Sequence, residues 1–164
     1  MYKSHSCGEL RSSQAGKKVT LAGWVHRRRD HGGLIFLDLR DRSGIVQTVF
    51  DPAEAPEAHA TASKARAEFV LSATGEVSAR PEGTENPELA TGDVELLVNE
   101  LEVLGEAVTP PLEIEDEIEA SDEVRMRYRY LDLRRRPMRE MIETRHRITM
   151  AMRKHLDERG FLDV

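Results

Sequence analysis

Three short segments in the first fifty residues alternate apolar and polar side chains, and they restrict the possible folds more than any other feature. They are residues 19–25 (VTLAGWV), 34–40 (LIFLDLR) and 44–50 (GIVQTVF). A period of two places successive side chains on opposite faces of a β-strand, so each segment predicts a strand. The Gly32-Gly33 pair predicts a hairpin between the first two strands, and Arg42-Ser43-Gly44 is a turn signal before the third.

The next fifty residues predict one helix and two further strands. Residues 51–69 are rich in alanine and contain no glycine, which predicts a helix that ends near Glu68. Residues 69–79 and 93–104 predict strands, separated by a loop rich in Pro, Gly and Asn. This is the element order of the OB-fold, a five-stranded Greek-key barrel. The predicted fold class is therefore mainly β, with one helix between strands three and four.

The remainder of the chain predicts a linker and the start of a second domain. Residues 106–124 contain Pro110-Pro111 and an acidic run that disfavours collapse. Residues 137–160 have helical periodicity, with Pro137 suited to the first turn and Gly160 to the stop. We expect an OB-fold domain over residues 1–105, a linker over 106–124, and a truncated second domain over 125–164. The apolar stripe of the predicted helix consists of Met141, Ile148, Met152 and Leu156.

The net charge of −6 conceals a segregation along the chain. Residues 1–50 hold nine Lys/Arg against four Asp/Glu, residues 51–123 hold three against twenty, and residues 124–164 hold twelve against six. Two basic blocks thus flank an acidic middle. Because local charge decides whether a polyanion can dock, a nucleic-acid partner is compatible with the acidic overall composition.

The N-terminal sequence and the single cysteine indicate a cytoplasmic protein. Cys7 is the only cysteine, which excludes an intrachain disulfide framework. Cys7 and His5 do not complete a zinc shell, so we expect no metal site and a solvated N-terminus. The start MYKSHSCGEL lacks the apolar stretch of a signal peptide, and no apolar run reaches the length of a membrane span.

The candidate site lies in RRRDHGGLIFLDLRD, residues 27–41. Strand periodicity places Ile35 and Leu37 on one face and Phe36 on the other, among charged residues, where a nucleobase could stack on it. The neighbouring arginines offer phosphate contacts, and Gln47 offers an amide to a base edge. The alternatives are that Phe36 caps the barrel core, that the arginines form a solvated hairpin tip, and that Gln47 bonds a neighbouring backbone group.

Four segments resemble class IIb aminoacyl-tRNA synthetases, in the right order along essentially the whole chain. GWVHRRRDHGGLIFLDLRDRSGIVQTVFDP (23–52) and ATGDVELLVNELEVL (90–104) resemble the anticodon-binding OB-fold of bacterial aspartyl-tRNA synthetases. RMRYRYLDLRRRPM (125–138) is similar to the segment that opens the class II catalytic domain, and RGFLDV (159–164) to the onset of motif 1. Asparaginyl and lysyl synthetases share this architecture, but the uninterrupted RRRDHGGLIFLDLRD and GIVQ favour the aspartyl branch.

The resemblance implies roles for individual residues. Phe36 matches the aromatic that stacks under the middle uracil of the anticodon, and Gln47 the residue that reads that base's edge. Arg29, with Arg27 nearby, matches an arginine that contacts the third base. Glu95 matches the acid that recognises the first guanine; without the resemblance it would be interpreted as a solvated strand carboxylate. Two further positions, His31 and Gly83, resemble the synthetase type that separates tRNA-Asp from tRNA-Asn less strictly.

The resemblance also implies what the whole protein does. The parent would be an aspartate–tRNA ligase dependent on ATP and magnesium, with tRNA as its partner. Motifs 2 and 3, which bind ATP and activate the amino acid, are missing. We therefore expect no catalytic residue and no cofactor in this fragment. The helix over residues 137–160 resembles the motif 1 helix that helps to build a homodimer interface.

Two other functions stay open from the sequence. A general single-strand-binding OB module would accept any base. A protein-interaction domain would bind through the predicted helix, and its binding would be indifferent to salt.

Overall fold

The structure, a computed structural model, describes residues 3–164. The chain divides between Thr109 and Pro110 into two compact units. The first contains every β-strand of the described residues, and the second contains the three C-terminal helices.

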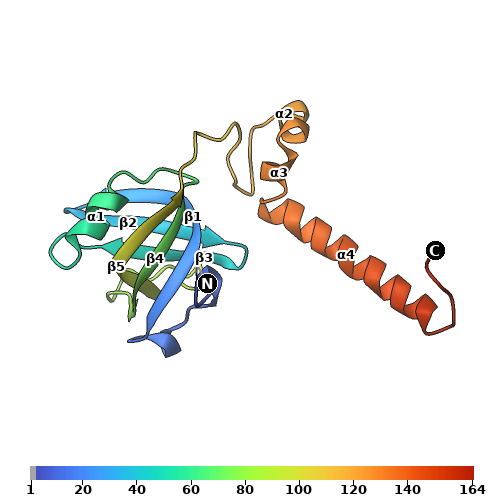
Figure 1. Ribbon diagram of the computed structural model, residues 1–164, viewed down its shortest axis with the longest axis horizontal. Coiled ribbons are helices and arrows are strands. Elements are labelled where there is room, and N and C mark those ends of the chain that lie inside the picture. The colour runs from blue at the N-terminus through green and yellow to red at the C-terminus, as the bar shows by residue number, and fades with distance from the viewer. Residues whose placement is uncertain (1–2) are drawn as a thin grey trace. The chain divides into compact units, whose positions relative to one another are not determined.

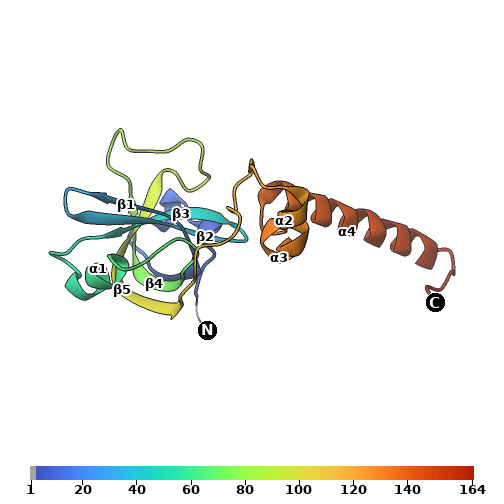
Figure 2. The ribbon, with the colours of Figure 1, turned by 90° about the horizontal axis from the view of Figure 1, so that it is seen from above.

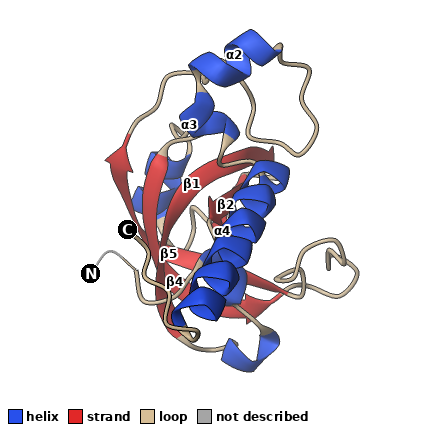
Figure 3. Ribbon diagram, turned by 90° about the vertical axis from the view of Figure 1, so that its right-hand side faces the viewer, coloured by secondary structure: helices blue, strands red, loops and turns tan. Residues whose placement is uncertain are grey.

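The first unit is a closed five-stranded barrel (Figures 1 and 3). Its strands are β1 (Lys18–His31), β2 (Leu34–Asp41), β3 (Gly44–Phe50), β4 (Val70–Ala79) and β5 (Val94–Gly105). They pair in the order β1-β2-β3-β5-β4, and β4 pairs back with β1. Only the β3–β5 pair is parallel. Closure removes the free strand edges, and the predicted OB-fold class is confirmed.

The barrel interior is apolar because each strand contributes alternate residues to it. In β2, for example, Ile35, Leu37 and Leu39 are at most 1% exposed, while the residues between them are half-buried. Phe50 on β3 is fully buried in the same core and pairs across the sheet with Ile35. This period-two pattern separates an inner face that stabilises the fold from an outer face that is free for binding.

The predicted helix over residues 51–69 is wrong in extent. Helix α1 covers only Pro56–Ala62, with the proline in its first turn, and buries Ala58 and Ala62 in the barrel core. After Ser63 the chain turns to deliver Phe69 to the core and then enters β4. Glu68 takes a positive φ of 65° on the way, which is incompatible with a helix. The alanine content of this segment reflects its helix propensity. The end of the helix is set instead by the turn that the chain must make to reach β4.

The segment before β1 is packed, so the prediction of a solvated N-terminus is wrong. Two short turns, η1 (Cys7–Glu9) and η2 (Ser12–Gln14), precede the barrel. Cys7 is fully buried in the core, and its burial, together with nearby Asp41, raises the pKa of the thiol. The Asp41 carboxylate accepts hydrogen bonds from the Cys7 backbone N–H at 3.1 Å and from Lys3 Nζ at 2.9 Å. Asp41 thereby joins the N-terminal segment to the end of β2.

The second unit has a small core of its own. It contains α2 (Asp122–Arg127), α3 (Arg129–Asp132) and α4 (Arg136–Asp157). Leu112 and Ile114, from the predicted linker, pack with Leu131 of α3 in spite of the surrounding acidic residues. Asp132 is fully buried and accepts hydrogen bonds from Arg129 and Arg135 at 2.7 Å each. An arginine cluster around one carboxylate therefore holds α3 in place.

Helix α4 is one continuous helix of 22 residues, close to the predicted range (Figure 1). None of its residues is buried, and the predicted apolar stripe is exposed: Met141, Ile148, Met152 and Leu156 are 45–62% exposed. Among the described helices, none is long and apolar enough to span a membrane.

Candidate nucleic-acid interface

Strand β1 is much longer than predicted and includes all three consecutive arginines. Its pairing with β2 shifts by one residue at a β-bulge: Val25 pairs with Leu39, whereas Arg27 pairs with Asp38. Figure 2 shows the two strands running beside each other as a long ribbon. The bulge reverses the alternation of side chains that the first half of β1 follows.

The reversal places Arg27, Arg29 and His31 on the outer face of the barrel. Beyond the bulge, Arg29 pairs with Phe36 and His31 with Leu34. Side chains of directly opposed residues lie on the same face of a sheet, so Arg27, Arg29 and His31 share the face of Phe36. Arg28 and Asp30 project to the other side and form an ion pair of 3.5 Å.

Phe36 lies on the outer face of β2 and is half-buried, while its neighbours Ile35 and Leu37 point into the core. The guanidinium carbon of Arg29 lies 5.9 Å from the centroid of the Phe36 ring, within the range of a cation–π contact. The ring is thus not part of the barrel core, and the core-cap alternative is wrong. A flat aromatic surface therefore stands next to a positive charge on the outer face, a combination that is compatible with base stacking.

Gln47 and Glu95 lie on the same outer face, on the two strands that follow β2 in the barrel. Gln47 on β3 pairs with Asp38 of β2, and the parallel register of β3 with β5 brings it next to Glu95. The Gln47 amide Nε2 donates to Glu95 Oε2 at 2.7 Å, and both residues are 7% exposed. Glu95 is therefore not a solvated strand carboxylate, and Gln47 does not merely bond the backbone.

Arg29 joins these residues into one network. Its Nη2 donates to Asp38 Oδ1 at 2.6 Å and to Gln47 Oε1 at 3.0 Å. Asp38 was not among the predicted site residues. Strand periodicity nevertheless places it on the face of Phe36, because the two residues are two positions apart. Four predicted residues therefore come together on the outer face across β1, β2, β3 and β5: Arg29, Phe36, Gln47 and Glu95.

The other predicted positions lie at or beyond the margin of this network. Arg27 and His31 are exposed on the outer face of β1. Gly83 belongs to another segment, the loop between β4 and β5, where its N–H donates to Glu85 Oε2 at 2.8 Å. Its φ is 83°, and no atom lies within 4 Å of the position that a Cβ would occupy. A side chain at residue 83 would thus meet open space but would strain the backbone.

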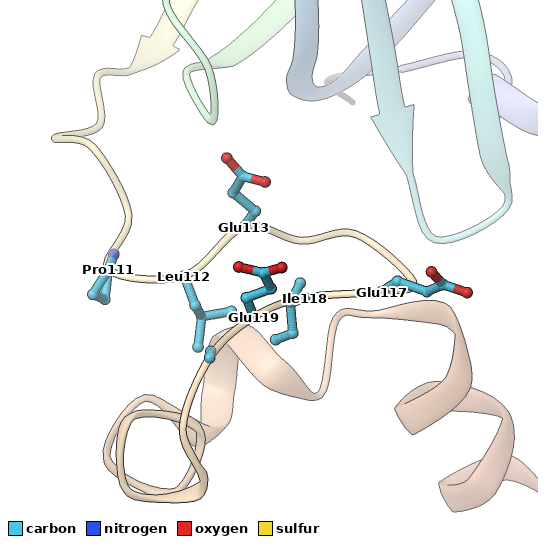
Figure 4. Close-up of a pocket in the computed structure, with 7 residues that line it drawn as sticks. Pro111, Leu112, Glu113, Glu117, Ile118 and Glu119 are labelled. Atoms are coloured by element: carbon cyan, nitrogen blue, oxygen red, sulfur yellow. The ribbon is translucent and has the colours of Figure 1, made fainter.

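The second unit offers a pocket with a different character. It is lined by Pro111, Leu112, Glu113, Glu117, Ile118, Glu119 and Ala120 (Figure 4). Its three glutamates disfavour an anionic ligand. Among residues 3–164, no group of three or more His, Cys, Asp or Glu side chains is arranged to hold a metal ion.

Comparison with known families assigns the barrel. Residues 19–104, just over half of the chain, match the model of the family described as OB-fold nucleic acid binding domain. The chain belongs to this family. Residues 121–164 of this OB-fold protein match a second family, described as tRNA synthetases class II (D, K and N).

Relatives of this OB-fold protein agree with both matches. It is 53% identical over 164 residues to the aspartate–tRNA(Asp/Asn) ligase of Moorella thermoacetica, and 49% identical over 163 residues to that of Protochlamydia amoebophila. These alignments cover 100% and 99% of the chain but only 27% of each relative. The asparaginyl-tRNA synthetase of Pyrococcus horikoshii superimposes with a TM-score of 0.82 at 31% identity, over 100% of this chain and 37% of that one. The chain thus spans about a quarter of the length of the curated relatives that it matches.

Proposed function

We propose that this chain recognises the anticodon of tRNA-Asp as the N-terminal part of an aspartate–tRNA ligase. The observation that carries the proposal is the outer-face network. The Arg29 guanidinium contacts the half-buried ring of Phe36 and donates to the Gln47 amide, which in turn donates to the Glu95 carboxylate. The names of the two relatives support an aspartate–tRNA ligase as the parent protein.

Each member of the network suits one part of base recognition. Phe36 offers a ring on which the middle base stacks, and Gln47 offers an amide to that base's edge. Glu95 is an acceptor that matches the ring and amino N–H groups of a guanine in the first position. Arg29 and Arg27 offer planar donors for the third base and for phosphates.

We propose that the same domain also accepts tRNA-Asn. The names of both relatives include Asp and Asn. His31 and Gly83 are the positions that we assign to this relaxed discrimination. His31 adds an imidazole to the outer face near the hairpin, and Gly83 leaves the β4–β5 loop without a side chain at its turn.

In the whole protein, we propose that the OB-fold selects the tRNA and that a class II catalytic domain uses ATP and Mg²⁺ to attach aspartate. Residues 121–164 match the beginning of that domain, and none of them is assigned a catalytic role. The exposed stripe of α4 suits a homodimer interface, because exposed apolar patches mark contact sites. We also propose that the whole protein works in the cytoplasm.

The proposal is tested with RNA hairpins that share one stem and differ only in the anticodon. The aspartate anticodon should bind the chain more tightly than a hairpin in which the same three bases are permuted. Equal affinities would contradict anticodon recognition and favour a general single-strand binder. Affinity should also fall as salt is added, because phosphate contacts release counterions. Binding that is indifferent to salt would instead favour a protein-interaction domain.

A further inference from the structure

Arg29 already makes the two contacts that a nucleobase would make at this site. Its guanidinium, a flat group, lies over the Phe36 ring with the carbon 5.9 Å from the centroid. One of its nitrogens, Nη2, donates to Gln47 Oε1 at 3.0 Å. A stacked base with an N–H on its edge would use the same ring and the same carbonyl oxygen.

We propose that Arg29 is an internal placeholder, which fills the base subsite of the unliganded chain and is displaced when a base enters. This inference rests on the proposed function and adds a step to it. The free energy of base binding then includes the loss of the guanidinium contacts. A base that stacks on Phe36 but cannot donate to Gln47 Oε1 does not restore the hydrogen bond that is lost when Arg29 leaves.

The orientation of the Gln47 amide supports this specificity. Its nitrogen end faces the Glu95 carboxylate at 2.7 Å, and its oxygen end faces the Arg29 guanidinium. Opposite charges at the two ends oppose a flip, because flipping would set N–H groups against a cation and a carbonyl against an anion. A base that replaces Arg29 therefore meets a fixed acceptor. It must present an N–H donor, as uracil does with its N3–H.

Asp38 is the positioning residue that retains the displaced arginine. Its Oδ1 accepts the second hydrogen of the same Nη2 at 2.6 Å, and its side chain is only 15% exposed. The register places Asp38 between Arg27 and Gln47, at the centre of the outer face. When the guanidinium leaves Phe36 and Gln47, this ion pair keeps it beside the subsite, where it can contact the RNA.

The test titrates uridine, an uncharged nucleoside, into the isotopically labelled chain and follows the Phe36 ring by NMR. Arg29→Ala opens the subsite, so uridine should bind about two- to fivefold more tightly, the factor that corresponds to one exposed cation–π contact. Arg28→Ala is the matched control. It removes the same charge from the same strand, but its side chain points to the other side of the sheet, so uridine affinity should stay at the wild-type value. Uridine that binds the Arg29→Ala variant no better than the wild type, or binds neither measurably, contradicts the placeholder.

Two further variants separate the placeholder from a structural role. Arg29→Lys keeps a charge opposite Asp38 but loses the planar group. An ammonium can still contact an aromatic ring and donate to Gln47, so Arg29→Lys should bind uridine more tightly than the wild type but less tightly than Arg29→Ala. It provides the test if the alanine variant fails to fold. Asp38→Asn should also raise uridine affinity, because it loosens the arginine. If Asp38→Asn binds uridine with the wild-type affinity, Asp38 does not position Arg29 in the subsite. In every variant, 3-methyluridine, which lacks the N3–H, should bind more weakly than uridine, and equal binding would contradict the fixed acceptor.

With the RNA hairpin in place of uridine, the expected change in affinity has the opposite sign. This difference distinguishes the placeholder from the proposed function. Arg29→Ala should weaken binding of the hairpin with the aspartate anticodon while it strengthens uridine binding, since the arginine also contacts the RNA. If permuted anticodons bind equally well, the proposed function fails, whatever uridine does. If anticodon discrimination holds but uridine prefers the wild-type chain, only the placeholder fails.

Discussion

Replacing Phe36 with alanine separates recognition from folding, because a second phenylalanine on the next strand provides a matched comparison. Phe36 lies half-buried on the outer face of β2, whereas Phe50 of β3 is fully buried in the core. Base stacking on an aromatic ring contributes about 1–3 kcal/mol, so Phe36→Ala should weaken binding of the cognate RNA hairpin by about five- to 150-fold. Phe36→Ala should lower the free energy of unfolding by only about 0.2–1 kcal/mol, the contribution of one cross-strand pair of side chains. Phe50→Ala should lower the free energy of unfolding by about 3–5 kcal/mol.

The two quantities are measured independently. Fluorescence anisotropy with a labelled hairpin gives the dissociation constant, and urea unfolding followed by circular dichroism gives the free energy of unfolding. The Phe36 reasoning is refuted if Phe36→Ala unfolds the barrel as readily as Phe50→Ala does. It is equally refuted if the variant keeps the wild-type affinity for the hairpin, because the half-buried ring of Phe36 would then not hold a base.

Three other predictions follow from individual contacts. Gln47→Ala should reduce discrimination at the middle base more than overall affinity, as measured with hairpins that differ only there; an equal loss for every anticodon would count against a reading role. Asp132→Ala should destabilise the second unit by about 3–5 kcal/mol in urea unfolding, because it leaves buried Arg135 without its carboxylate. The third prediction is a loss of thermal stability in acid. Burial alone would raise the pKa of Asp41, but hydrogen bonds from Ser43, Lys3 and the Cys7 backbone outweigh it and hold the pKa below the usual 3.8. This contribution is present above the unfolded pKa and disappears as pH falls through the folded one, so Asp41→Asn should flatten the fall of Tm below about pH 4.

The alternation of apolar and polar residues predicted which side chains of a strand point into the barrel and which point outward. The inner and outer faces of β2 follow from alternation alone, which is why the sequence by itself places Phe36 on the face opposite Ile35 and Leu37. Composition, which predicted the helix over residues 51–69, failed for α1, because alanine content carries no information about where the chain must turn to reach β4. The acidic composition of residues 106–124 was equally misleading for Leu112 and Ile114, since acidic neighbours do not prevent two apolar residues from packing on Leu131.

The arrangement of the site depends on a feature that no local pattern indicates. If β1 continued the alternation of Val19, Leu21 and Val25, then Arg27 and Arg29 would point inward, and Arg28 would share the face of Phe36. One extra residue at the bulge, between Val25 and Arg27, reverses this assignment. The hydrogen bonds that link Arg29, Gln47 and Glu95 then connect strands that are distant in sequence, and only the closed barrel brings those strands together. The residue types at the site could therefore be predicted from the sequence, but their contacts could not. Those contacts arise from strand register, and that register is set by pairing between strands rather than by the composition of any one of them.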